Sequence, residues 1–591
     1  MKACFLVLFL LFGTHCFSEN ENKIIKYLPV QQDGRIKPLD TIARSSLLLL
    51  HGSQSLTHQG KKISAINWLL DVMMNSKKAK KIKLIRVENK DLLKLLGSKI
   101  EKPTYYSIAE LQPYFDELYN LSSQIMSIDE KEQDAFQKAT IVLWQQITIY
   151  LRLSNSFWIS EIDNIPSEFS AFQQSIYNDF KSSLYPKKAN SISIQWFQER
   201  YKFLAKAAYF SIIPSMKGDD QWLNMGEGLL FGINEKYPHL LINQMVNIIS
   251  AYQKNSRSFS HLVSNYIDEI NRFLPNVDKK IKFEVFYNDL EPFFISTIIY
   301  LTVIIVSILS WIFKKDKLRA ISFVFFIFGC LLHFFGLFSR MYIEGRPPVT
   351  NLYSSAVFVG CSGVLFSLFM EYRHRNSAGC IAGSIIGALT LIVAYHLSMN
   401  GDTMEVLRAV LNSNFWLSTH VVTITLGYSS TFFAGSLAMI YIFRGFLTRS
   451  LDMKTSNVLA SMVYKTIFYS AFLSFVGTIL GGFWADQSWG RFWGWDPKEN
   501  GALLIILWNV IILHAKIAGF IKKRGLMVLA VFGNVVTALS WFGVNILSVG
   551  LHSYGFINGT FFWLAIFVLS QIVIMGMGLL PKHYWRSQES L

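Results

Sequence analysis

The sequence predicts an all-α polytopic membrane protein with about nine transmembrane helices, preceded by an exported, mainly helical domain. Composition supports this fold class: 51% of the 591 residues are hydrophobic, only 16% are charged, and the mean hydropathy is +0.31. Repeated apolar runs of roughly 18–25 residues, each long enough to cross a bilayer as a helix, begin only near residue 293. We therefore expect residues 19–290 to form the exported domain and residues 291–591 the transmembrane domain.

Residues 1–18 resemble a signal peptide. Lys2 is a basic start, an apolar core runs from Phe5 to Gly13, and Cys16 and Ser18 are small enough for a cleavage site. The alternative is an uncleaved anchor, but the apolar run is too short to span a bilayer comfortably. Both alternatives place residues 19–290 outside the cytoplasm.

The five cysteines lie in the signal segment or in the apolar runs, so the exported domain has none. This excludes a disulfide framework, a zinc cluster and a thiol–disulfide exchange role for that domain. The sequence has no Cys-X-X-Cys-His motif either, so the chain is not itself a c-type cytochrome.

The net charge is +16, and part of it comes from a lysine run at residues 77–83. A solvated basic face explains this run more simply than attraction to anionic lipid headgroups. Nucleic acid is not expected as a partner, because the domain lies outside the cell membrane.

Nine apolar segments follow Pro292, and basic clusters fall at every second end of them. The clusters are Lys314, Lys315, Lys317 and Arg319; Arg373 and Arg375; Arg444 and Arg449; Lys522, Lys523 and Arg524; and Lys582 and Arg586. Positive charge in short loops marks the cytoplasmic side. All five clusters agree with a multi-pass protein of the bacterial inner membrane whose residue 290 lies outside and whose C-terminus is cytoplasmic. The outer loops, 340–350, 398–416, 483–500 and 549–559, contain the unusual residues.

The most informative stretch is residues 481–499 (GGFWADQSWGRFWGWDPKE), which contains Trp484, Trp489, Trp493 and Trp495. An interfacial aromatic belt explains some indoles at a membrane edge. It explains less well four of them interleaved with glycines, which let a backbone approach a flat ligand. Indoles offer large rigid faces to a planar aromatic macrocycle, and Arg491 adds positive charge. The stretch therefore favours a ligand-binding loop.

The acidic end of this stretch also has a structural explanation. Asp496 is placed as an N-cap, Pro497 at the first helical position and Glu499 at the third, which predicts a capping box at the start of a span. A helix N-terminus at this point also favours an anionic ligand, to which Lys498 adds direct charge.

Histidines lie at a depth that matches this loop. His420 is near the outer end of its span, and His552 is in the last outer loop. A single histidine near a membrane surface is most simply a hydrogen-bonded residue, but a pair flanking a tryptophan-rich loop favours axial ligation of haem iron. His514 is a further candidate, because ionisable residues within spans are often functional. From the rise per residue of an α-helix, it should lie about 20 Å below the outer edge of its span. His333 and His396 are weaker candidates.

Four stretches resemble a known family. Residues 489–499 (WGRFWGWDPKE) are similar to the WWD signature of the cytochrome c assembly family of membrane haem-handling proteins, in its CcsA-type branch, which serves system II cytochrome c biogenesis. The others are residues 345–353 (GRPPVTNLY), 411–420 (LNSNFWLSTH) and 550–555 (GLHSYG). Together they extend from about residue 320 to residue 560.

The resemblance implies haem b held outside the membrane by His420 and His552, which flank the WWD loop. It also implies a second, intramembrane haem site with His514 as one ligand. The other ligand there would come from His333 or from a second membrane assembly subunit. The implied partners are haem, an apocytochrome c with its Cys-X-X-Cys-His motif, and a thiol-reducing partner.

Residues 27–44 (YLPVQQDGRIKPLDTIAR) resemble a segment found ahead of fused assembly proteins of this type. Their residue pattern predicts an extended strand–turn piece at Asp33 and Gly34, followed by a helix. Helical periodicity dominates the rest of the exported domain, and we expect this domain to grip apocytochrome.

Three functions compete. In the first, haem held by His420 and His552 presents its vinyl groups to the two thiols of a Cys-X-X-Cys-His substrate, which would make the chain a haem-ligating enzyme of the holocytochrome c synthase type. In the second, the chain is a haem transporter or chaperone that hands haem on without forming thioether bonds. In the third, it is a respiratory subunit, which would need paired intramembrane histidines where only His514 is well placed. We rank them in this order.

Overall fold

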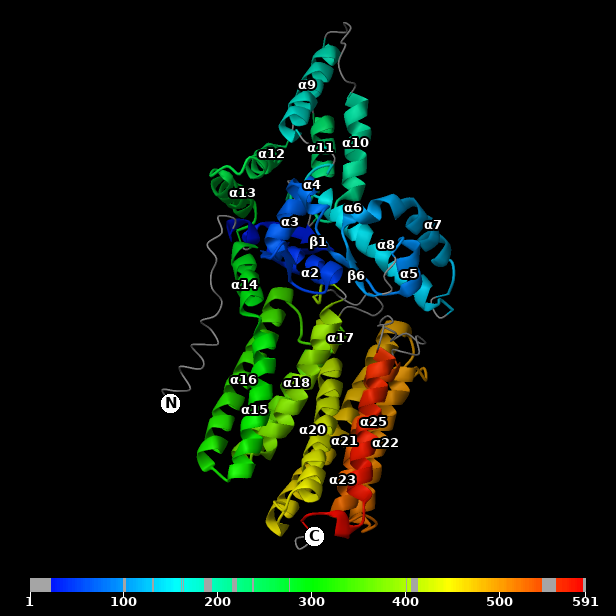
Figure 1. The fold of residues 1–591 in the computed structure, drawn as a ribbon. Coiled ribbons are helices and arrows are strands. Elements are labelled where there is room, and N and C mark those ends of the chain that lie inside the picture. The colour runs from blue at the N-terminus through cyan, green and yellow to red at the C-terminus, as the bar shows by residue number, and fades with distance from the viewer. Residues whose placement is uncertain are drawn as a thin grey trace. The chain divides into compact units, whose positions relative to one another are not determined.

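The structure is a computed structural model with two compact units, Met1–Asp289 and Leu290–Leu591. It describes residues 23–98, 102–129, 132–160, 162, 164–184, 194–214, 221–235, 237, 239–275, 277–399, 401–404, 413–544 and 560–587. The predicted signal peptide, residues 1–18, therefore lies outside the described residues. The predicted fold class is confirmed, because the described chain is mostly helical in both units (Figure 1).

Unit 1 is a helical domain with three short antiparallel hairpins, β1–β2, β3–β4 and β5–β6. Its described elements are η1 (Lys23–Tyr27), β1 (Pro29–Gln32), β2 (Arg35–Pro38), α2 (Leu39–His51), β3 (Ser55–His58), β4 (Lys61–Ser64), α3 (Ala65–Met74), α4 (Ser76–Ala79), β5 (Ile85–Val87), α5 (Lys90–Leu95), β6 (Thr104–Tyr106), α6 (Ile108–Leu111), η2 (Gln112–Tyr114), α7 (Phe115–Ile125), α8 (Ala135–Ser154), α9 (Ile165–Leu184), α10 (Ile194–Ala207), α11 (Met225–Glu235), α12 (Leu240–Gln253), α13 (Phe259–Phe273) and α14 (Val277–Leu290). One apolar cluster that includes the buried Trp68 and Trp158 forms its core.

The segment of residues 27–44 forms the hairpin β1–β2 and the start of α2, as predicted from its residue pattern. Asp33 and Gly34 take positive φ angles of 49° and 78° at the turn, which suits a two-residue hairpin loop. The segment packs on α14 through charged groups: Arg35 donates to both carboxylate oxygens of Glu284, at 3.0 and 2.9 Å, and Thr41 donates to Glu284 at 2.7 Å. The buried Glu284 carboxylate is thus paired and hydrogen-bonded, as a charge in a core must be.

Unit 2 is a bundle of long apolar helices. Its described elements are α15 (Pro292–Phe313), α16 (Asp316–Glu344), α17 (Leu352–His374), α18 (Ala378–Ser398), α19 (Asn414–Trp416), η3 (Leu417–Val421), α20 (Val422–Leu447), α21 (Met453–Trp489), α22 (Pro497–Ile517), α23 (Lys523–Ala538), η4 (Leu539–Gly543), α25 (Thr560–Leu579) and η5 (Lys582–Tyr584). Nine helices of the described chain are long and apolar enough to cross a membrane, which agrees with the predicted number. The chain is a multi-pass membrane protein.

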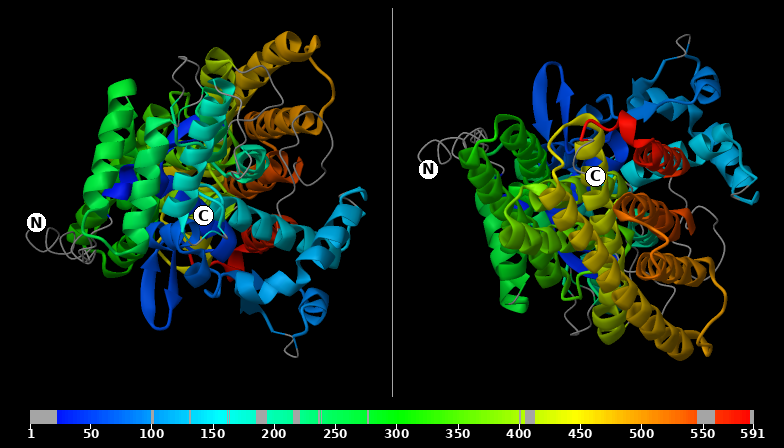
Figure 2. Two further views of the ribbon diagram at one scale, coloured as in Figure 1. Left: turned by 90° about the horizontal axis from the view of Figure 1, so that it is seen from above. Right: turned by 90° about the horizontal axis from the view of Figure 1, so that it is seen from below.

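Helix α20 lies at the centre of this bundle, where it packs against α17, α18, α21 and α23. Seen end-on in Figure 2, the helices follow one another from the green α15 and α16, through the yellow α20, to the orange and red helices α21 to α25. Small residues allow the closest approach, because a side chain on Gly477 would meet the Ile424 backbone 2.8 Å away. Small residues at helix contacts are typical of membrane bundles.

The two ends of unit 2 differ in composition. The tryptophan end is the one at which α21 ends and α22 begins, with Trp484 to Trp495. The basic end is the opposite one, at which α22 ends and α23 begins, with Lys516 to Arg524. Helix α21 continues through Trp489, so Trp484 and Trp489 lie on a helix, and the non-helical part of the predicted loop 483–500 is only residues 490–496.

Candidate functional site

The tryptophan end contains a pocket formed by six elements of unit 2. Its walls come from the start of α17, from η3 and α20, from the last turns of α21, from the start of α22 and from η4. Its cavity volume is about 180 Å³. Ligand pockets usually hold about 300–1,000 Å³, so a cofactor-sized ligand would extend beyond this cavity. Of the predicted site residues, His420, Trp484, Trp489 and Trp493 line this pocket.

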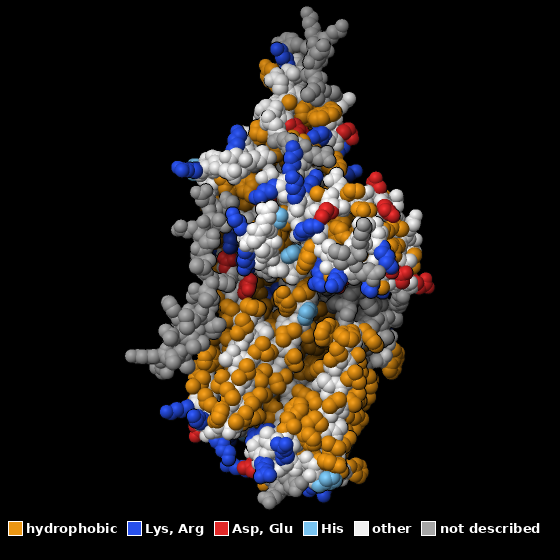
Figure 3. Space-filling view, in the orientation of Figure 1, with side chains coloured by type: hydrophobic (Ala, Val, Ile, Leu, Met, Phe, Trp, Pro, Cys, Tyr) orange, Lys and Arg blue, Asp and Glu red, His pale blue; other side chains and the backbone are white. Residues whose placement is uncertain are grey.

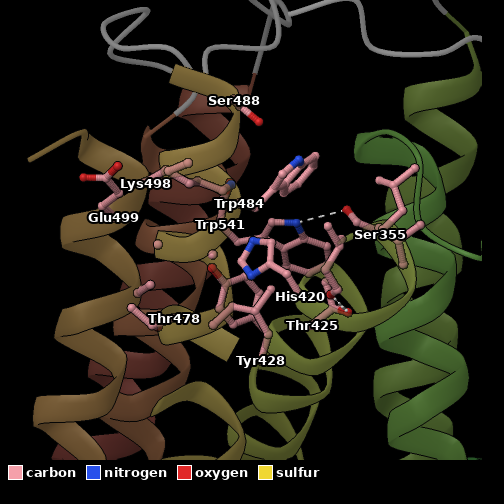
Figure 4. A pocket seen from close by; sticks show the side chains of 18 of the residues that line it. Ser355, His420, Thr425, Tyr428, Thr478, Trp484, Ser488, Lys498, Glu499 and Trp541 are labelled. Atoms are coloured by element: carbon pink, nitrogen blue, oxygen red, sulfur yellow. Dashed lines mark hydrogen bonds between the residues drawn. The ribbon is translucent and has the colours of Figure 1, made fainter. Parts of the chain in front are cut away.

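His420 is held in one orientation by the neighbouring helix. Its Nδ1–H donates a hydrogen bond to the carbonyl oxygen of Gly477, 2.8 Å away, so the neutral ring carries its lone pair on Nε2. The ring also lies beside Trp484, with centroids 5.7 Å apart (Figure 4). This arrangement gives an imidazole the fixed tautomer that metal-ligating histidines have.

The closeness of α21 to His420 depends on Gly481. A Cβ atom added at this position would lie 2.5 Å from Cε1 of the imidazole, well inside van der Waals contact. Gly477 and Gly481 are four residues apart and therefore share one face of α21. One glycine supplies the carbonyl that orients the ring, and the other leaves the space that the ring occupies.

Two polar atoms on the same wall have no hydrogen-bond partner among the described residues. The indole Nε1 of Trp484 and the hydroxyl of Ser488 are both buried and unsatisfied, and they lie one helical turn apart on α21. Both residues line the pocket. Because buried polar groups are almost always paired, these two atoms are available to a polar group of a ligand.

The structure does not bring two other predicted residues to the pocket wall. Trp495 is 71% exposed and takes a positive φ of 56°, with its ring edge-on to Trp493 at 6.0 Å. Arg491 is exposed and is absent from the described lining residues. Both residues lie in the short connection between α21 and α22.

The predicted capping box at the start of α22 is present. The Asp496 side chain accepts from the backbone N–H of Lys498, and the Glu499 carboxylate accepts from the backbone N–H groups of Asp496 and Gly494, at 3.1 and 2.8 Å. Glu499 therefore fixes the connection that carries Trp493. Lys498 points into the pocket and donates to the carbonyl oxygen of Trp541 at 3.0 Å (Figure 4).

Sequence reasoning missed Trp541, which lines the pocket from the π-helical turn η4. Its indole N–H donates to the Ser355 hydroxyl at 3.2 Å, a bond drawn in Figure 4, and its ring packs near Tyr428. His420 also lies on a π-helical turn, η3. Such turns are rare and occur frequently at functional sites. The available signal was a tryptophan near the outer end of a predicted span.

Residues of the stretch 345–353 form the opposite wall, and Thr350, Asn351 and Leu352 contact the pocket. Asn351 caps α17 and donates to the carbonyl oxygen of Thr403 at 2.8 Å. The buried Arg340 binds the same carbonyl at 2.7 Å. These two bonds to the Thr403 carbonyl hold the start of α17 in place.

The remaining predicted histidines lie elsewhere. His514 is in the last turn of α22, about 25 Å along the helix from Pro497, which is deeper than the predicted 20 Å. Its ring is exposed, and its Nδ1–H donates to the Val510 carbonyl at 2.9 Å. His333 is fully buried outside the pocket lining. Its Nε2–H donates to the Val357 carbonyl at 3.1 Å, and its Nδ1 lies 3.2 Å from the Tyr300 hydroxyl oxygen. His552 lies outside the described residues.

The pocket residues fit the chemistry of haem, a flat aromatic macrocycle with two carboxylates and an iron that takes imidazole ligands. The four lining indoles would provide faces, and the imidazole of His420 would provide a metal ligand. The Lys498 ammonium and the unsatisfied donors of Trp484 and Ser488 suit carboxylates.

Comparisons with known proteins identify the family. Residues 349–552 match the family model described as cytochrome C assembly protein. Cytochrome c biogenesis protein CcsA of Guillardia theta is 33% identical over 296 residues, which cover 45% of this chain and 97% of that protein. CcsA of Prochlorococcus marinus (strain MIT 9301) is 29% identical over 284 residues, covering 42% of this chain and 89% of the relative.

Two further proteins are similar to longer portions of the chain. Protein NrfI of Wolinella succinogenes is 26% identical over 544 residues, 88% of this chain, and the chain spans about half, 53%, of that relative's length. The solved structure of cytochrome c heme lyase CcmF aligns with a TM-score of 0.37 and 13% identity, over 49% of each chain. The match to nearly the whole of a CcsA protein at 33% identity establishes the family. This chain is a multi-pass membrane protein of the cytochrome c assembly family and belongs to the proteins of cytochrome c biogenesis.

Proposed function

We propose that the chain binds haem b in the aromatic pocket and presents it for covalent attachment to the Cys-X-X-Cys-His motif of apocytochrome c. One observation carries the proposal: His420, whose ring is oriented by the carbonyl oxygen of Gly477, lines the same pocket as Trp484, Trp489 and Trp493. A belt of interfacial indoles would not need an oriented imidazole among them.

The residues have separate roles in this proposal. His420 and His552 would hold the haem iron, and the indoles would hold the macrocycle. Lys498 pairs with a propionate at the start of α22, where the helix dipole also favours an anion. Arg491 and Trp495 lie at the exposed rim, where they can contact incoming haem or substrate. His514 serves a second, intramembrane haem site, to which His333 or a second membrane subunit contributes.

The attachment step requires little chemistry from the protein. Each cysteine thiol adds across a vinyl group: a sulfur–carbon bond forms at one vinyl carbon, the thiol proton ends on the other, and nothing leaves. Positioning of haem beside the two thiols is therefore the main catalytic contribution. A separate thiol-reducing partner keeps the cysteines available.

The orientation follows from the positive-inside rule. The basic end, with its clusters of Lys and Arg, faces the cytoplasm of a bacterium, and the tryptophan end faces outward. Haem attachment then takes place on the outer side of the inner membrane, where unit 1 would hold the apocytochrome.

The test is to express the full chain in a bacterial host that lacks its own cytochrome c assembly system. An exported reporter carries Cys-X-X-Cys-His, and its matched control carries Ser-X-X-Ser-His, with a thiol reductant supplied. Covalent haem on the first reporter alone supports ligation. Haem that co-purifies with the chain without any covalent product assigns the transporter role instead. A chain purified without haem from haem-replete cells contradicts the proposal.

A further inference from the structure

The basic end of unit 2 contains a second cavity, of about 740 Å³. Five cationic side chains line it: Lys516, Lys522, Lys523, Arg524 and Lys582. None of its described lining residues is acidic, and no carboxylate of the described chain forms an ion pair with any of the five. Like charges around one cavity repel one another, and an anion within it would relieve this repulsion.

Arg524 is held rigidly at the cavity wall. Its Nη2 donates to the carbonyl oxygens of Gly578, at 2.8 Å, and Leu580, and its guanidinium lies 4.5 Å from the centre of the Trp585 ring. Its Nε is buried and has no hydrogen-bond partner among the described residues. A cation with one unused donor, fixed in place by its other contacts, is preorganised for an anionic oxygen.

The N-terminus of α23 opens at the same cavity. Lys522 occupies the N-cap position, and no side chain of the described residues caps the first turn. The backbone N–H groups there have no helical acceptor, and the helix dipole adds partial positive charge. An uncapped helix start beside lysines is a common setting for phosphate.

The surroundings of the cavity are apolar and belong to the ends of membrane spans. Val528 and Leu579 line it from α23 and α25. The side chains of α25 are largely exposed: Leu569, Ile572, Val573 and Leu579 have between 52% and 68% of their surface free within the chain. Figure 3 shows blue Lys and Arg side chains next to the orange band at this end of unit 2. A ligand with a charged head and apolar tails matches this pairing of surfaces.

We propose that this basic cavity binds the phosphate of an anionic membrane lipid, with its acyl chains along α25. Lys516, Lys522 and Lys582 supply the charge, and Arg524 Nε and the first N–H groups of α23 supply fixed donors. Basic pockets between span ends are a recurrent site for anionic headgroups. The cavity is separate from the aromatic pocket around His420, and His514 is not among its described lining residues, so the lipid test does not depend on haem binding at His420.

The experiment compares two triple variants of the full-length protein, delipidated in detergent. K516Q/K522Q/K582Q removes three charges from the cavity. K314Q/K315Q/K317Q removes three exposed charges at the same end of unit 2, in the link from α15 to α16 and the first turn of α16, outside the cavity lining. Native mass spectrometry measures binding of cardiolipin, phosphatidylglycerol, phosphatidylcholine and inorganic phosphate to each variant and to the parent.

The expected result is binding of the two anionic lipids to the parent and to the control variant, with cardiolipin binding to the cavity variant about tenfold weaker or more. Phosphatidylcholine, which has no net charge, should bind all three proteins weakly. Equal losses in both variants would overturn the proposal in favour of general attraction to a basic face. Equal binding by all three proteins, or competition by millimolar inorganic phosphate that matches the lipids, would also overturn it.

Discussion

The Nδ1–H of His420 donates to the carbonyl oxygen of Gly477 across 2.8 Å, which joins a π-helical turn at the start of α20 to the small-residue face of α21. This bond decides which ring nitrogen keeps a lone pair. It also makes the imidazole part of the helix contact rather than a mobile side chain at a membrane edge.

Changing His420 to Gly should abolish covalent haem attachment, and added imidazole should restore part of it. The glycine leaves a gap the size of the lost ring, which free imidazole can enter as an untethered ligand. The measurement is covalent haem on an exported Cys-X-X-Cys-His reporter. His552→Gly should behave in the same way if both residues bind one iron.

His396→Gly is the matched control, because His396 is exposed near the tryptophan end, outside the pocket lining. It should attach haem normally. Attachment that survives loss of His420 without imidazole would remove His420 from the ligand set.

Gly481→Ala should weaken haem retention about tenfold. This is the usual loss of metal affinity when a group that orients a metal ligand is changed. The new Cβ lies 2.5 Å from Cε1 of His420, so the ring must leave its position. The measurement is the Soret absorbance per mole of purified protein. Gly576→Ala, a helical position with nothing within 4 Å of its added Cβ, should retain normal haem. Equal haem in both variants would show that the ring position is unimportant.

Trp493→Ala should reduce haem affinity more than Trp495→Ala. Trp493 lines the pocket, whereas Trp495 is 71% exposed beside it. Loss of one stacked ring costs about 1 kcal/mol, or roughly fivefold in affinity. Haem titration of the apo variants measures both. The opposite order would mean that haem sits on the outer face of this connection.

Lys498→Met should weaken binding of haem about tenfold and leave binding of haem dimethyl ester nearly unchanged, because a charge-assisted bond contributes about 1.5–3 kcal/mol and the ester has no carboxylates. The variant also loses the bond that Lys498 donates to Trp541, but this loss affects haem and the ester equally. The difference between the two ligands therefore reports on the carboxylates alone. Arg491→Gln, at an exposed position outside the pocket lining, should affect both ligands little. Similar losses for haem and ester would assign Lys498 a structural role only.

Helix α12 of unit 1 should lose protection as the pH falls below 6.5. His239 is the N-cap, its Nδ1 accepts from the backbone N–H of Leu241 at 3.2 Å, and burial lowers its pKa below the usual 6.5. The unfolded state takes up a proton first, so stability is complete above pH 6.5 and falls between 6.5 and the folded pKa. Hydrogen exchange of the full chain at pH 7.5 and 5.5, corrected for intrinsic rates, measures the loss. His239→Asn keeps a capping group that does not titrate and should remove the pH effect.

The nine spans were predictable because an apolar run of about 20 residues is a local property of the chain. The position at which α21 ends could not be predicted, because its last turns are held by long-range contacts. One of these is the bond from the Trp416 indole to Gln487 at 2.7 Å. The capping box at Asp496 was predictable, since every group it needs lies within four residues.

Within the site, the predictable residues were those in a dense pattern, such as Trp484, Trp489 and Trp493. Trp541 was missed because one tryptophan in an apolar span has no local mark that separates it from a core residue. The exposed position of Trp495 depends on a positive φ in the connection, which residue type does not reveal. The burial of His333 depends on contacts from α15 and α17, including Tyr300 and Val357.

The two π-helical turns that contribute His420 and Trp541 point to how such a pocket is altered. A π-turn is an α-helix with one inserted residue. Deleting one residue from Leu417–Val421 or Leu539–Gly543 would restore the regular repeat and rotate the preceding side chains by about 100° relative to the rest of the helix. The pocket can therefore be opened, closed or re-aimed by single-codon insertions and deletions, while the membrane-crossing part of each helix keeps its packing.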